Sequence, residues 1–132
     1  MGLRIELKAG DQIIVGSSAI ENAGSHRAVL VISGREPILR SKHVLTLATA
    51  DTPAKLIYYA VQTMLISDNP EKVLADYGRL VESYLEAAPS SADLIGELQA
   101  LVAEERYYPA LLKARDLIEF ESAILGGRSD PE

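Results

Sequence analysis

Five basic residues near the start of the sequence are the strongest candidates for a functional role. They fall at turns and at solvent-facing or edge positions of expected strands: Arg4, Lys8, Arg35, Arg40 and Lys42. Cationic side chains at such positions can hold the phosphates of RNA, while exposed backbone edges read its unpaired bases. We therefore take the five as candidate RNA-binding residues. The alternative is a scattered positive surface, and charge alone does not separate the two.

Charge is divided unevenly along the chain. The net charge of −6 argues against a general nucleic-acid binder, which needs clustered lysine and arginine. Residues 1–50, however, hold six bases and four acids, whereas residues 51–132 hold seven bases and fifteen acids. The first part therefore carries +2 and the second −8, which fits different partners for the two parts. An equally good explanation is that helix surfaces are simply rich in Glu and Asp.

Catalytic chemistry finds little support in the sequence. The two histidines, His26 and His43, have no metal-ligand spacing, there is no cysteine, and neither a phosphate-binding loop nor a nucleophile elbow is present. Two groups of acids could do acid–base work, but solvated helix faces explain them better: Glu104 with Glu105, and Glu119 with Glu121. We expect no enzyme, no metal site and no cofactor.

Tyrosine is the dominant aromatic residue, with six copies against one Phe and no Trp. Four of the six form two adjacent pairs, Tyr58 with Tyr59 and Tyr107 with Tyr108. Neighbours on a helix point about 100° apart, so one ring of each pair can enter the core while the other reaches the surface. Tyrosine is favoured at interfaces, so the four are candidate protein-interaction residues. The alternative is that both rings of each pair only pack in or under the surface.

The first 46 residues read as short strands. Leu3, Ile5 and Leu7 alternate with charged residues, the pattern of a strand with one buried face. Residues 12–15 form a second short apolar run, and residues 19–21 lead into residues 22–25, which look like a hairpin loop. The run Val29–Ile32 reads as a strand buried on both faces, and residues 37–40 as a short edge segment. We predict a small antiparallel β module over residues 1–46.

Helical patterns begin after residue 50. Thr52 is a natural N-cap and Pro53 suits the first helical position. Apolar residues then recur at helical spacing in four segments that are separated by proline-containing breaks. We predict a bundle of about four helices over residues 47–125 and a flexible tail over residues 126–132. The fold class is α+β.

The expected location is the cytoplasm. Charged and apolar residues alternate over residues 1–8, unlike the apolar core of a secretory signal. No stretch approaches the roughly 18–20 apolar residues that a membrane span requires. We therefore expect no membrane association.

The order and spacing of several stretches resemble the FlbT family over residues 3–125. The matching stretches are residues 7–14 (LKAGDQII), 19–24 (AIENAG), 38–40 (ILR), 52–62 (TPAKLIYYAVQ) and 106–111 (RYYPAL). The resemblance implies a post-transcriptional regulator that associates with the 5′ untranslated region of flagellin messenger RNA, repressing in some bacteria and activating in others. It also implies a functional relationship to FlaF, a second small flagellin regulator.

The β module is similar, more weakly, to the RNA-binding repressor CsrA. Both have an alternating first strand, a glycine–acid turn (here Gly10-Asp11) and a short last strand leading to an arginine, here Arg40. That arginine contacts RNA in CsrA proteins, whose first strand ends in paired arginines. Leu7 and Lys8 occupy those places here. The likeness therefore implies Lys8 and Arg40 as the best RNA-contacting candidates.

Two functional hypotheses follow. In the first, the β module binds RNA directly, with a homodimer as an open alternative to a monomer. In the second, the acidic helical part binds flagellin or FlaF through its amphipathic faces, and the effect on messenger RNA is indirect.

Overall fold

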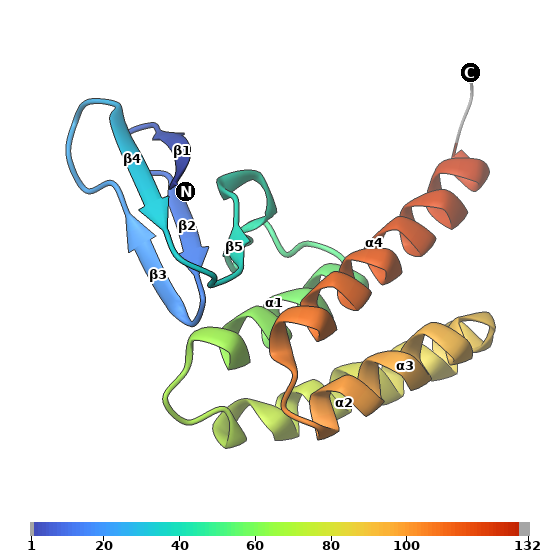
Figure 1. The fold of residues 1–132 in the computed structure, drawn as a ribbon. Coiled ribbons are helices and arrows are strands. Elements are labelled where there is room, and N and C mark those ends of the chain that lie inside the picture. The colour runs from blue at the N-terminus through green and yellow to red at the C-terminus, as the bar shows by residue number, and fades with distance from the viewer. Residues whose placement is uncertain (1, 130–132) are drawn as a thin grey trace. The chain divides into compact units, whose positions relative to one another are not determined.

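The computed structural model describes residues 2–129 and confirms the α+β class (Figure 1). Strands come first and helices follow. The elements are β1 (Gly2–Leu7), β2 (Gln12–Val15), β3 (Ser18–Glu21), β4 (Ala28–Ser33), β5 (Ile38–Leu39), the 3-10 helix η1 (Ser41–His43), α1 (Pro53–Ile66), α2 (Glu71–Ala87), the 3-10 helix η2 (Pro89–Ser91), α3 (Ala92–Ala103) and α4 (Tyr107–Ser129). Contacts divide the chain into two compact units, the β unit (Met1–Val44) and the helical unit (Leu45–Glu132).

The β unit consists of two small antiparallel sheets. In the first, β1 pairs with β4, so that Ile5 lies opposite Leu30; in the second the strand order is β3-β2-β5. Side chains from both sheets form one apolar cluster, in which the alternating residues of β1 supply two of the three buried members. The cluster contains buried Ile5, Leu7 and Ile13 with partly buried Val15, Leu30, Ile32 and Ile38 packed against them.

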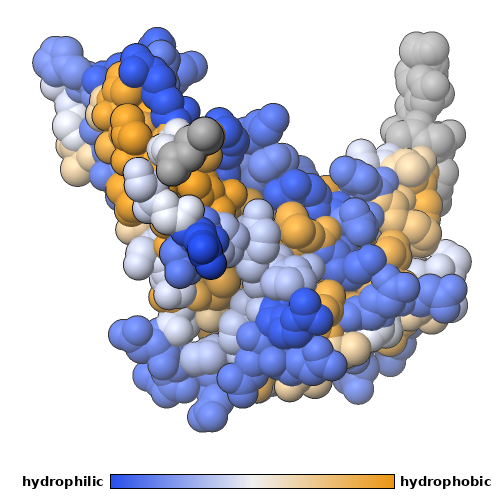
Figure 2. Space-filling view, viewed as in Figure 1, coloured by the Kyte–Doolittle hydropathy of each residue, from blue (hydrophilic) through white to orange (hydrophobic). Residues whose placement is uncertain are grey.

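The prediction that β4 is buried on both faces is wrong. Its side chains alternate, and Val29 and Val31 are 47% and 66% exposed. The reason is that β4 belongs to a two-stranded sheet with a single covered face, and Figure 2 shows apolar residues on the surface of this unit. The strand that is covered on both faces is β2, where neighbouring Ile13 and Ile14 are both fully buried.

The hairpin also lies one connection earlier than predicted. Gly16, with φ of +61°, sits in the turn between β2 and β3, whereas the segment after β3 crosses to the other sheet. Asn22 holds this crossing in place because its Nδ2 donates to the carbonyl of Leu7 (2.9 Å) and to that of His26 (2.8 Å). A partly buried polar side chain with two backbone partners replaces the β-ladder that a hairpin would supply.

The helical unit begins as the sequence predicts. Thr52 caps α1 by accepting a hydrogen bond from the backbone N–H of Lys55 (3.2 Å), and Pro53 is the first helical residue. Helix α1 packs against α2 and α4, and α3 packs against α4. The buried face of α1 explains this central position, since it is built from Ala54, Ile57, Tyr58, Ala60, Val61, Gln62 and Met64.

Helix α4 is longer than expected. It runs to Ser129, so the backbone of residues 126–129 is helical where the sequence predicts a flexible tail. Residues 130–132 of that predicted tail lie outside the described residues. Of the helices in residues 2–129, none has the length and apolarity to cross a membrane.

Gln62 fixes the chain segment that leads into α1. Its side chain is 4% exposed and forms two hydrogen bonds with the backbone of Leu45: Oε1 accepts from the N–H (2.9 Å) and Nε2 donates to the carbonyl (2.8 Å). These bonds pair the N–H and the carbonyl of Leu45, which lies in a segment that belongs to neither a strand nor a helix.

Replacing Gln62 with methionine should therefore destabilise the helical unit. Methionine has a similar length but cannot pair with the two backbone groups of Leu45, so we expect the free energy of unfolding to fall by about 1–3 kcal/mol. Urea denaturation measures this change. The control is Gln99→Met, because Gln99 is exposed on α3. Equal losses in the two variants would contradict a specific role for the Leu45 contacts.

Candidate functional site

Arg4 lies on the outer face of β1, away from the apolar cluster. It is exposed and stands opposite exposed Val31 on β4. Two residues further along the same strand, the carboxylate of Glu6 accepts a hydrogen bond from the guanidinium of Arg27 at 3.0 Å. Arg27 is therefore engaged by an acid, whereas Arg4 has no ion pair among the described residues.

The register separates the remaining candidates into two groups. Lys8 follows Leu7 at one end of the β1–β4 pair, while Arg35 follows Ser33 at the opposite end, closer to Arg4. Strand β5 runs antiparallel to β2, so the chain that leaves β5 heads back toward the start of β2 and the turn containing Lys8. Arg40 follows β5 directly and Lys42 lies in η1.

The turn end of the β unit thus holds three of the five candidates. We call Lys8, Arg40 and Lys42 the basic end; all three are exposed, and none forms an ion pair within residues 2–129. Arg4 and Arg35 lie toward the other end of the β1–β4 pair. Phosphates of a nucleic-acid chain are several ångströms apart, so separated exposed cations can each contact a different phosphate.

The four candidate tyrosines differ in exposure. Tyr58 is 2% exposed, and its three counterparts Tyr59, Tyr107 and Tyr108 are half-buried. Burial raises the pKa of Tyr58, and a hydrogen bond from the guanidinium of Arg115 partly offsets that rise. Burial also raises the pKa of Tyr107. Tyr58 therefore belongs to the interior, whereas Tyr59, Tyr107 and Tyr108 each keep part of the side chain accessible.

An apolar groove opens in the helical unit instead. Its volume is about 590 Å³, and it lies between the start of α1, the C-terminal half of α2 and the later turns of α4. Figure 2 shows apolar residues on the surface of this part of α4. The principal apolar side chains of the lining are Pro53, Leu56, Leu80, Ile124 and Leu125. The groove could not be predicted from the sequence because its walls come from three separate segments.

Glu121 also lines this groove, and the prediction that it lies on a solvated face is wrong. It is 9% exposed, and its Oε2 accepts a hydrogen bond from the backbone N–H of Ala54 at 3.1 Å. The first N–H groups of a helix lack partners within the helix and favour negative charge, which explains a carboxylate here. Its position four residues after buried Leu117 was the available signal, since it continues the buried stripe of α4.

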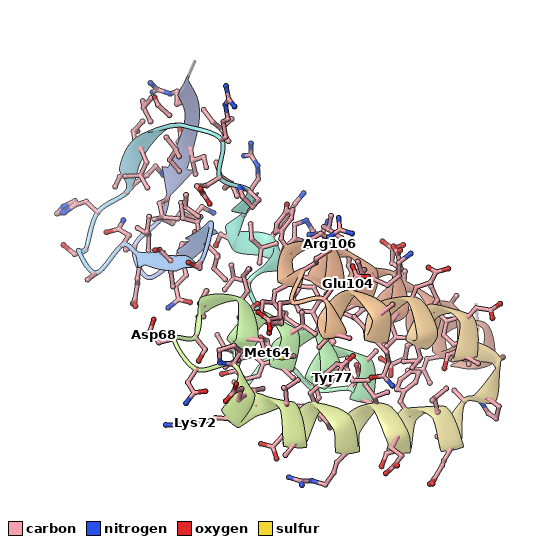
Figure 3. All side chains as sticks on the ribbon, turned by 60° about the horizontal axis from the view of Figure 1, so that its bottom comes forward. Met64, Asp68, Lys72, Tyr77, Glu104 and Arg106 are labelled. Atoms are coloured by element: carbon pink, nitrogen blue, oxygen red, sulfur yellow. The ribbon has the colours of Figure 1, made fainter. Side chains whose placement is uncertain are left out.

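The other acids considered in the sequence are exposed. Glu119 lies on the outer side of α4, and Glu104 and Glu105 lie at the end of α3. Figure 3 shows Glu104 and Arg106 close together on the surface, where an ion pair joins them at 3.8 Å. Among the described residues, no group of three or more acids and histidines is arranged to hold a metal ion.

Comparison with known proteins gives a consistent result. A family model described as "Flagellar protein FlbT" matches residues 3–125. The "Probable flagellum biosynthesis repressor protein FlbT 1" of Bradyrhizobium diazoefficiens is 40% identical over 126 residues, which cover 96% of this chain and 86% of that protein. The corresponding protein of Rhodopseudomonas palustris is 36% identical, covering 95% and 98%. The "Flagellum biosynthesis repressor protein FlbT" of Caulobacter vibrioides is 29% identical, covering 96% and 91%. No solved structure matches this chain.

Two tyrosines of α2 make the stability of the fold sensitive to alkaline pH. Burial raises the pKa of Tyr77 to about 12, and burial together with Glu121 raises that of Tyr84 to about 12, from an ordinary value of 10.0. Figure 3 shows Tyr77 directed from α2 toward the neighbouring helices, and its hydroxyl has no hydrogen-bond partner among the described residues. Ionising either phenol in the folded chain is therefore costly.

We expect the free energy of unfolding to fall between pH 10 and pH 12. In this range the unfolded chain loses tyrosine protons that the folded chain retains, so the stabilisation is complete below pH 10 and is lost as pH approaches 12. The loss should be on the order of 2 kcal/mol for each tyrosine. Urea denaturation across this range measures it, and Tyr77→Phe should flatten the decline. An unchanged slope in that variant would exclude Tyr77 as a source.

Proposed function

The chain belongs to the FlbT family of flagellar proteins, and on this premise we propose that it represses flagellum biosynthesis by contacting the 5′ untranslated region of flagellin messenger RNA. The observation that carries the RNA contact is the basic end, Lys8, Arg40 and Lys42, exposed in a chain whose helical part is strongly acidic. A bound protein on the leader keeps initiating ribosomes from that segment, which is a direct route to repression.

Electrostatics confines the proposed contact to the β unit. Residues 51–132 carry −8, a charge that repels a phosphate chain, whereas residues 1–50 carry +2. Exposed cations on short strands suit single-stranded RNA, since its splayed bases stay accessible to polar and backbone groups beside the phosphate contacts. The proposal applies equally to a monomer and to a homodimer.

The double variant Lys8→Ala/Arg40→Ala should weaken binding to the flagellin leader by roughly tenfold in a gel-shift assay. It should also lower the slope of log affinity against log salt by about 1.4, because each phosphate contact on a single strand contributes about 0.7. The assay is run from roughly 50 to 200 mM salt.

The matched control is Lys72→Ala/Arg79→Ala, which removes two exposed cations from α2. Figure 3 shows Lys72 pointing away from the helical unit, and Arg79 is already paired with Asp76. The control should leave both affinity and salt slope unchanged. Wild-type affinity in the Lys8/Arg40 variant, or an equal loss in the control, would remove the basic end from the RNA site.

The groove of the helical unit favours a second candidate function, in which the chain binds flagellin or FlaF and acts on messenger RNA indirectly. Binding a protein partner in this way needs an apolar surface on the acidic helical unit. The groove provides such a surface.

Pull-down of purified flagellin or FlaF after nuclease treatment distinguishes this function from direct RNA binding. Association that survives nuclease and the Lys8→Ala/Arg40→Ala change, without any gel shift of the leader, would select the second function. Association that disappears with nuclease would reject it.

A further inference from the structure

We infer that the groove of the helical unit is a docking site for an amphipathic helix of a partner protein, with apolar side chains seated in the groove and one lysine or arginine paired with Glu121. The inference rests on the second function proposed above and names the chemistry of its partner.

The shape and lining of the groove suit one face of a helix. Segments of α1, α2 and α4 line the groove, which is neither an enclosed cavity nor a flat surface. Its volume of about 590 Å³ takes several apolar side chains but not a whole helix, whose diameter with side chains is about 10–12 Å. Ile124 and Leu125 on α4 are 38% and 48% exposed at its edge, and a partner helix would cover them.

Glu121 is the residue that would make the groove selective for a partner with a basic side chain. It is nine-tenths buried and lines the groove, and the N–H of Ala54 engages one of its oxygens. Among residues 2–125, whose side chains the structure describes, no cation pairs with this carboxylate. Lys55, in the first turn of α1, pairs with Asp51 at 3.3 Å instead. The charge of Glu121 is balanced only by the start of α1, so a cation that a partner brings can pair with it.

The surroundings of the groove favour a basic helix over other occupants. Exposed Glu82 and Glu86 adjoin Ser83 and Ala87 of its α2 wall. These acids attract a partner with basic flanks and repel the acidic helical unit of a second copy.

Fluorescence anisotropy with two synthetic peptides tests the site on the full chain. Both probes are labelled 18-residue amphipathic helices with a leucine stripe and basic flanks; one has a lysine at the centre of the stripe and the other a methionine. We expect the lysine peptide to bind roughly tenfold more tightly. In Glu121→Gln this preference should vanish, since the amide oxygen still accepts the Ala54 N–H but carries no charge.

A matched pair of variants controls for folding and for non-specific apolar binding. Ile124 and Leu112 both lie on α4 and are both 38% exposed, but only Ile124 lines the groove. Ile124→Asp should weaken both peptides by roughly tenfold, whereas Leu112→Asp should not. Circular dichroism melts confirm that each variant is folded.

Several outcomes would overturn the inference. Absence of peptide binding, equal losses in the Ile124 and Leu112 variants, or an unchanged lysine preference in Glu121→Gln would each do so. Saturable binding of hexylamine without peptide binding would assign the groove to small amines. Concentration-dependent dimers that Ile124→Asp abolishes would assign it to a second copy. If flagellin or FlaF still binds Ile124→Asp, the groove is excluded while the second function stands.

Discussion

A single buried carboxylate links the two ends of the helical unit. Glu121 on α4 accepts a hydrogen bond from the backbone N–H of Ala54 in the first turn of α1. Thr52, the N-cap residue of α1, accepts one from the N–H of Lys55 in the same turn. Two hydrogen bonds therefore fix the start of α1. One is local, from Lys55 to Thr52, and the other joins Ala54 to Glu121, 67 residues later in the sequence. Because α1 packs against both α2 and α4, this turn helps to set the spacing of three helices, and the apolar groove opens beside it.

The two units divide the chemistry of the chain between them. The β unit presents exposed cations on a small apolar core, whereas the helical unit combines excess acid with an open apolar groove. RNA and an amphipathic helix are recognised by opposite charges, so one chain can carry both kinds of surface without competition between them.

Local signals made much of the fold predictable. Thr52, Pro53 and the apolar spacing that follows define α1 within one segment, and the α+β order follows from similar patterns. Features that depend on distant parts of the chain were missed. The run Val29–Ile32 does not reveal that only one face of β4 is covered. The sequence around Glu121 does not reveal that its carboxylate bonds to the start of α1. Likewise, Lys8 and Arg40 come to the same end of the β unit only through strand register.

Ultraviolet crosslinking of the full chain to the flagellin leader, with the crosslinked peptides identified by mass spectrometry, tests the central claim most directly. We expect crosslinks within residues 1–44, concentrated around Lys8 and the segment from Arg40 to Lys42, and none in α1, α2, α3 or α4. Crosslinks that fall mainly in residues 53–129, or none at all under conditions where the protein represses flagellin synthesis, would contradict it.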